Sequence, residues 1–391
     1  MTNKEKVTTK GNRLHFLDNL RTIIIFLVIL YHVGGVYEET GMWASFWIVD
    51  DPATNTVSGM IGLIVDVFVM ATMFFVSGYL APASLKSKNG WEYIKAKFNR
   101  LIVPWIIAVL TLIPLYKVIF LFSRNLPQEH WTTYFHFSKE NISGQSWLWF
   151  LPLLFTFNIL YLLFSKANIK TPNISLKSAV FGTFLIGFVY SAGMDLFDLR
   201  GWTLTPLLDF QNERVLIYFM FFLLGALCFR LKVFDAKPES KKLYNIVNYT
   251  SWIPIMFYIF FLIFPVVISP GDYIFSKIID RSIVWFSFQL SLFSIVYLLI
   301  ESFWRYLDKP GKIWNVLNQN SYYVYIIHVI VIGAIATLLL NTAIPTVLKY
   351  FILIVTSYLA SNLIVSLYLK AAMKINMRRD NSMSNKKISL T

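Results

Sequence analysis

The sequence contains little cysteine and little charge. Cys228 is the only cysteine among 391 residues, which excludes an intrachain disulfide and any metal site built from several cysteines. Charged residues make up 14% of the chain, whereas soluble globular proteins typically carry about 25%. Hydrophobic residues make up 57%. This balance indicates a polytopic membrane protein and excludes an ordinary soluble one.

Ten apolar runs are long enough to cross a membrane as helices, which need about 20 residues to span the hydrocarbon layer. Strands of a membrane barrel would be only about ten residues long and would alternate apolar with polar side chains. The expected fold is therefore all-α, with about ten transmembrane helices. The runs are 20–37, 59–80, 101–122, 146–165, 178–194, 215–231, 251–269, 283–301, 321–340 and 349–369.

Lysine and arginine are concentrated on one side of this topology. Of the 35 basic residues, 27 lie in alternate segments between the runs and at the two ends of the chain. The positive-inside rule then places both termini in the cytoplasm, and the even number of spans agrees. The net charge of +14 therefore reflects short loops and does not indicate a nucleic-acid partner. The expected location is a cell membrane, most simply the cytoplasmic membrane of a bacterium.

This topology divides the chain into three parts. Residues 1–13 form a cytoplasmic N-terminal segment, residues 14–370 the transmembrane domain, and residues 371–391 a polar cytoplasmic tail whose composition is typical of disorder. On the same side, residues 91–100 read as a basic amphipathic segment lying on the membrane surface.

His32 is the first ionisable side chain expected deep in the membrane. It follows Arg21 by eleven residues, so the two share one face of a helix and lie roughly 16 Å apart along its axis. If Arg21 is at the inner surface, His32 is about halfway across the bilayer. A buried ionisable group of this kind is a functional candidate by default. The alternative is a structural histidine that donates one ring N–H to a neighbouring helix.

Asp66, in the second run, lies at a depth comparable with that of His32. A contact between them would orient the imidazole and stabilise its protonated form, as in a base with its orienting carboxylate. The alternative is a carboxylate held by Arg or Tyr for packing. His328 is about 10 Å in from the cytoplasmic side, where structural and substrate-lining roles are equally open.

Arg21 and Arg100 begin their helices at the inner face. Such arginines can contact lipid phosphates, or they can bind the phosphates of a cytosolic nucleotide-bearing donor. Ser77 and Gly78 leave room for close backbone approach at that side, although a small-residue helix contact explains them equally well. The remaining histidines, His15, His130 and His136, show no pattern of function, and no metal site is expected.

Taken together, these motifs resemble acyltransferase family 3, a family of integral-membrane acyltransferases, and especially its glucan-modifying branch. The similarity covers roughly residues 13–370, and one departure is Trp147, where members often have histidine. The matching motifs are LDNLR followed by YH, LIVDVFVMATMFFVSGY, KFNRLIVPW, GQSWLWFLPLL and NSYYVYIIHVIV.

The resemblance implies transfer of an acetyl or succinyl group from cytosolic acyl-CoA to a hydroxyl of an extracytoplasmic glycan or lipid-linked sugar, with no permanently bound cofactor. It implies that His32 is the catalytic histidine and that Arg21 is its partner. Arg100 would bind the donor. Asp66 carries over as a catalytic residue, Ser77 and Gly78 as part of the donor site, and His328 and Trp149 as substrate-lining residues.

With this assignment, we expect His32 to line a cavity that opens to the cytoplasm near Arg21 and Arg100. Two other readings remain open. One is a proton-coupled transporter or exporter that uses His32, Asp66 and His328 as a relay. The other is a non-enzymatic membrane scaffold.

Overall fold

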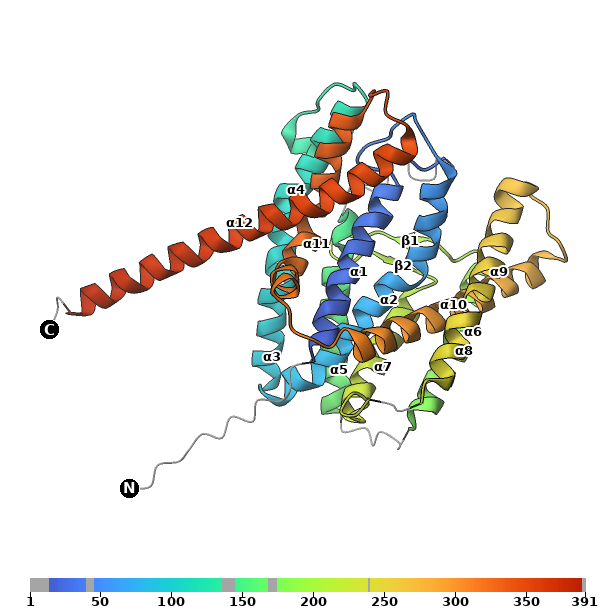
Figure 1. The fold of residues 1–391 in the computed structure, drawn as a ribbon, viewed down its shortest axis with the longest axis horizontal. Coiled ribbons are helices and arrows are strands. Elements are labelled where there is room, and N and C mark those ends of the chain that lie inside the picture. The colour runs from blue at the N-terminus through green and yellow to red at the C-terminus, as the bar shows by residue number, and fades with distance from the viewer. Residues whose placement is uncertain (1–13, 40–45, 136–144, 168–173, 238–239, 389–391) are drawn as a thin grey trace.

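The computed structural model describes residues 14–39, 46–135, 145–167, 174–237 and 240–388. Within these ranges the chain is almost entirely helical, as Figure 1 shows, with one short hairpin. The elements are α1 (His15–Gly34), α2 (Thr56–Lys86), α3 (Gly90–Lys97), η1 (Phe98–Ile102), α4 (Val103–Ser123), η2 (Trp131–Phe135), η3 (Ser146–Trp149), α5 (Phe150–Lys166), α6 (Leu176–Leu196), β1 (Trp202–Thr203), β2 (Phe210–Gln211), α7 (Val215–Arg230), α8 (Lys242–Thr250), α9 (Trp252–Ile263), η4 (Phe264–Ile268), α10 (Lys277–Tyr306), α11 (Lys312–Leu339) and α12 (Thr346–Ile388).

The described residues include nine helices that are long and apolar enough to cross a membrane. Each predicted run coincides with one of these helices or with α7, which is apolar but only 16 residues long. The all-α polytopic prediction is therefore confirmed. At 1.5 Å per residue, α7 spans about 24 Å, less than the full hydrocarbon thickness.

The centre of the bundle is the contact between α2 and α7. A Cβ added to Gly78 would lie 1.9 Å from the carbonyl oxygen of Phe222, and one added to Gly225 would lie 2.1 Å from that of Phe75. Only glycine permits the two backbones to approach this closely. Helix α1 packs against α2 on one side and α11 on the other, so the first helix is an inner helix of the bundle (Figure 1).

The loop between α6 and α7 enters the bundle. Its hairpin pairs Trp202 with Gln211 and Thr203 with Phe210, and Figure 1 shows both strands at mid-height among the helices. At the end of this loop, Arg214 forms an ion pair with Asp66, which is ten residues, or about 15 Å, inside the start of α2. The predicted runs 178–194 and 215–231, with both termini in the cytoplasm, would make this segment an outer loop, but its end lies well inside.

The surface segment before α4 is helical and continuous with the span that follows. Asn89 caps α3, and its side chain and that of Glu92 bond reciprocally to each other's backbone N–H. The π-helix η1 then joins α3 to α4 and carries Arg100. Such π-turns widen the helix and often occur at functional sites.

Helix α12 projects far beyond the bundle (Figure 1). It continues to Ile388, so the backbone of the polar tail predicted to be disordered is helical as far as that residue. The segment contains no proline or glycine that would stop a helix propagating from the apolar span before it.

Candidate active site

Two histidines from distant parts of the sequence meet between α1 and α11. His32 lies in the last turn of α1, nearer the end of the helix than the expected midpoint. Its Nδ1 lies 2.9 Å from the carbonyl oxygen of Val28 and 3.0 Å from Nε2 of His328. His328 is fully buried, and its own Nδ1 lies 2.6 Å from the carbonyl oxygen of Tyr325.

These contacts assign the ring protons. A carbonyl oxygen only accepts hydrogen bonds, so the Nδ1 atom of each ring carries the proton. Nε2 of His328 then accepts from Nδ1–H of His32, and the lone pair of His32 lies on Nε2. This is the tautomer that a general base requires, with the second histidine in the place of an orienting carboxylate.

Trp47 covers one face of the His32 ring. The two rings are stacked at 5.2 Å with an angle of 8° between their planes, and Trp47 is buried. The indole is held in place by Tyr116, whose ring meets it edge-on, and by Arg124, which donates to its carbonyl oxygen at 3.0 Å. The imidazole is therefore shielded by the loop that follows α1.

Asp66 is not the orienting partner that the sequence analysis expected for His32. Its carboxylate lies 2.6 Å from Arg214 and also bonds to the hydroxyl of Tyr31. Arg214 was missed as a site residue, because the sequence places it just before the apolar run 215–231 and does not show how deep that run begins.

Arg21 fastens α1 to α11. Its Nε and NH2 each lie 3.3 Å from an oxygen of that helix, on Ser321 and Asn318 respectively, and it also forms an ion pair with Asp18. Thr22 donates to the Asn318 side chain at 2.5 Å. Because His32 and His328 lie further along the same two helices, this network fixes their relative position. Arg21 thus acts on His32 through the helix pair, eleven residues away.

A cavity of about 300 Å³ lies on the side of the bundle that carries Arg21 and Arg100. Its cationic groups gather at one end, while its deeper wall is apolar and aromatic. Ser77 lines it, as the sequence analysis expected of the donor site. The lining residues are Arg21, Ile25, Met73, Val76, Ser77, Leu80, Ser84, Lys97, Arg100, Leu101, Phe150, Leu151, Leu154, Asn158, Ser321, Tyr322 and Tyr325.

The deep end of this cavity stops short of His32. Tyr325 forms part of the wall there, and its carbonyl oxygen accepts from His328. The rings of Tyr325 and Phe150 meet edge-on at 5.7 Å. His32 is not on the cavity wall, contrary to expectation, because Tyr325 and His328 lie between them.

Gly78 does not belong to the cavity wall. It is buried against Phe222 of α7, so the alternative of a small-residue helix contact is the correct one. Arg100 lies at the mouth, exposed, and its carbonyl oxygen accepts from the hydroxyl of Tyr322 on α11. Of the residues predicted for a donor site, Arg100 and Ser77 therefore line the cavity and Gly78 does not.

The tryptophans of the SWLW segment have different surroundings. Trp147 is buried and donates through Nε1 to the carbonyl oxygen of Ile326 at 2.9 Å. Trp149 is half-buried and packs edge-on against Trp202 of the hairpin, at 5.4 Å. Trp147 therefore supports α11, and Trp149 faces the hairpin.

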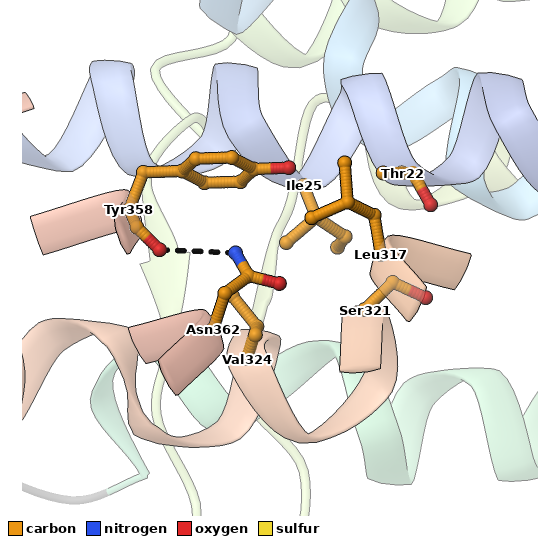
Figure 2. Close-up of a pocket in the computed structure, with 7 residues that line it drawn as sticks. All are labelled: Thr22, Ile25, Leu317, Ser321, Val324, Tyr358 and Asn362. Atoms are coloured by element: carbon orange, nitrogen blue, oxygen red, sulfur yellow. Dashed lines mark hydrogen bonds between the residues drawn. The ribbon is translucent and has the colours of Figure 1, made fainter. Parts of the chain in front are cut away.

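A small cleft lies on the other side of the seam between α1 and α11, where α12 crosses it (Figure 2). Ile25 and Ser321 line both this cleft and the larger cavity. The cleft is lined by Thr22, Ile25, Leu317, Ser321, Val324, Tyr358 and Asn362, and Asn362 donates to the carbonyl oxygen of Tyr358.

The other histidines lie apart from the pair formed by His32 and His328. His15 begins α1, and His130 is exposed and bonds to Thr132. His136 lies outside the described residues. Across the described ranges, no group of three or more His, Cys, Asp or Glu side chains is arranged to hold a metal ion.

A helical bundle of this kind, with a histidine pair beyond a cavity lined by cationic residues, defines a polytopic membrane protein with a buried polar site. Residues 14–368 match the family model described as the acyltransferase domain of acyltransferase family 3. The match covers nearly the whole chain, so the protein belongs to this family and is a membrane acyltransferase. Neither the curated proteins nor the solved structures that were compared include a match to this chain.

Proposed function

We propose that this protein transfers an acetyl or succinyl group from cytosolic acyl-CoA to a hydroxyl of an extracytoplasmic glycan or lipid-linked sugar, with His32 as the general base. The observation that carries the proposal is the juxtaposition of the His32–His328 pair with the end of a cavity whose opposite end carries Arg21, Lys97 and Arg100.

The cavity suits the two chemical parts of acyl-CoA. Guanidinium groups bind phosphate through paired, charge-assisted hydrogen bonds, and Arg100 lies exposed at the mouth with Lys97 beside it. The uncharged pantetheine arm would occupy the apolar interior. The reactive thioester would then reach Tyr325 and His328, and displacement of the Tyr325 ring would bring it to His32.

The assigned tautomer supports a complete reaction cycle. Nε2 of His32 takes the proton of the acceptor hydroxyl while the oxygen attacks the thioester carbonyl carbon. The tetrahedral intermediate then collapses, the C–S bond breaks, and the proton on Nε2 passes to the leaving thiolate. During the cycle Nε2 of His328 accepts from Nδ1–H of His32 and so stabilises the imidazolium.

The test is donor-dependent acylation in inside-out membrane vesicles that hold the acceptor glycan in the lumen. With [¹⁴C]acetyl-CoA outside, wild-type protein should label the lumenal glycan. Substitution His32→Ala should lower the rate 10²–10⁴-fold, the usual contribution of a general base, and the exposed control His130→Ala should not. Wild-type transfer by His32→Ala protein would disprove the assignment. Gradient-driven flux of an unmodified substrate would instead support a transporter.

A further inference from the structure

The ion pair between Asp66 and Arg214 lies inside the bundle, close to the histidine pair. The hydroxyl of Tyr31 bonds to Asp66, and those of Tyr218 and Tyr258 bond to Arg214. The ring of Tyr31 meets the neighbouring His32 ring at 5.2 Å. A polar group bound at this pair would therefore lie beside the proposed base.

The pair is incompletely satisfied. The Arg214 side chain is only 7% exposed, yet its Nε is buried and has no hydrogen-bond partner among the described residues. A buried donor without a partner costs free energy, and the cost is larger when the group is charged. Asp66 still has 24% of its side chain exposed, although it lies ten residues inside α2. Part of the Asp66 side chain therefore remains exposed beside a buried donor that has no partner in the described part of the chain.

Aromatic side chains flank the ion pair between Asp66 and Arg214. Trp149 packs against Tyr218 at 5.9 Å and against Trp202 of strand β1 at 5.4 Å. Trp202 is exposed, so the ring has a face available for contact. A flat aromatic face with a polar group beside it suits a ligand that has both apolar and hydroxyl-bearing faces.

The named charges around the ion pair between Asp66 and Arg214 leave a net negative charge. The positive charge of Arg214 is matched by Asp66, and the neighbouring Glu213, whose carboxylate accepts from the Gly201 backbone N–H at 2.8 Å, adds a negative charge. An anionic ligand would gain no net attraction here and would meet two carboxylates.

We propose that Tyr31, Asp66, Trp149, Trp202 and Arg214, together called the hairpin site, bind the acceptor of the reaction, and that this acceptor is a neutral sugar. The sugar ring stacks on the tryptophans, one of its oxygens accepts from Nε of Arg214, and the reacting hydroxyl points past Tyr31 to His32. The role as acceptor site rests on the proposed acyl transfer, whereas binding of the sugar does not.

The experiment measures binding without acyl-CoA. Full-length protein in nanodiscs is titrated with maltotetraose, a neutral probe, and with tetragalacturonate, an anionic probe of equal length, by saturation-transfer difference NMR. We expect saturable binding of maltotetraose and at least tenfold weaker binding of tetragalacturonate. Arg214→Lys keeps the charge beside Asp66 but removes Nε–H, and should weaken maltotetraose binding at least tenfold.

Two further variants complete the design. Trp202→Ala removes a side chain that is 47% exposed, so it tests the site even if Arg214→Lys protein is unstable; it should also weaken binding at least tenfold. Lys277→Gln, at an exposed lysine paired with Asp198, is the matched control and should bind like wild type.

The outcomes separate the two proposals. Absence of saturable maltotetraose binding, equal binding of both probes, or wild-type affinity in Trp202→Ala and folded Arg214→Lys protein would each overturn the hairpin site. None of these results depends on acyl transfer. If sugar binding behaves as expected while His32→Ala protein keeps full transferase activity, the site stands and the proposed mechanism fails.

Discussion

Nδ1 of His32 and Nε2 of His328 lie 3.0 Å apart, although the two residues are separated by 296 positions in the chain. Each histidine also bonds through Nδ1 to a carbonyl oxygen of its own helix, that of Val28 or Tyr325. The bonds to the two carbonyl oxygens fix both rings. His328 therefore helps to hold His32 in the tautomer that accepts a proton at Nε2.

The first prediction concerns His328 as a positioning residue. His328→Ala removes one of the two acceptors of Nδ1–H of His32 and leaves only the carbonyl oxygen of Val28. We expect kcat to fall about 10²-fold with the KM for acyl-CoA within twofold. His328→Gln retains an acceptor oxygen and should recover part of the lost kcat. Steady-state kinetics with varied acyl-CoA give both constants. A rise in KM at constant kcat would instead place His328 in substrate binding.

The second prediction concerns the cavity mouth. Arg100→Gln should raise the KM for acyl-CoA roughly tenfold or more, because it removes a charge-assisted contact to phosphate. The kcat should change little, and the dependence of KM on salt concentration should weaken. Lys95→Gln is the matched control, since Lys95 is exposed on the adjoining α3 and does not line the cavity. Equal effects of the two substitutions would indicate attraction by surface charge alone.

The third prediction concerns the contact between α2 and α7. Gly78→Ala would place a Cβ 1.9 Å from the carbonyl oxygen of Phe222, a backbone atom that cannot move without separating the helices. We expect a loss of about 1–3 kcal/mol or more in the free energy of unfolding, seen as a lower Tm by differential scanning fluorimetry in detergent. Gly182→Ala in α6, where an added Cβ meets no described atom within 4 Å, should leave Tm unchanged or raise it.

The fourth prediction concerns the ion pair between Asp51 and Lys349. Their side chains are each 2% exposed and lie 2.9 Å apart, joining the loop before α2 to the start of α12. Lys349→Met leaves a buried carboxylate unpaired, so we expect a loss of about 3–5 kcal/mol in stability. The double variant Asp51→Asn, Lys349→Met removes both charges and should recover much of it. Thermal unfolding of the four proteins of this double-mutant cycle gives the coupling, and additive losses would contradict a direct interaction.

Some parts of the candidate site were predictable from local sequence and others were not. Arg100 and Ser77 were identified because their positions at helix ends depend only on the order of apolar and polar residues. Gly78 was misassigned because helix α7, which excludes any side chain there, is remote in the sequence. His32 and His328 were both identified as histidines within the membrane, but the contact between them was not predicted.

The sequence by itself determined the class of fold, since apolar length and the absence of charge are properties of each segment taken alone. The tertiary structure alone decided which ionisable groups meet: His32 with His328, and Asp66 with Arg214. The physical reason is that a helix pattern fixes depth and face but not the neighbouring helix. The ion-pair partner of a buried charge is the oppositely charged group that tertiary packing places within hydrogen-bond distance. Here the loop before α7 places Arg214 beside Asp66.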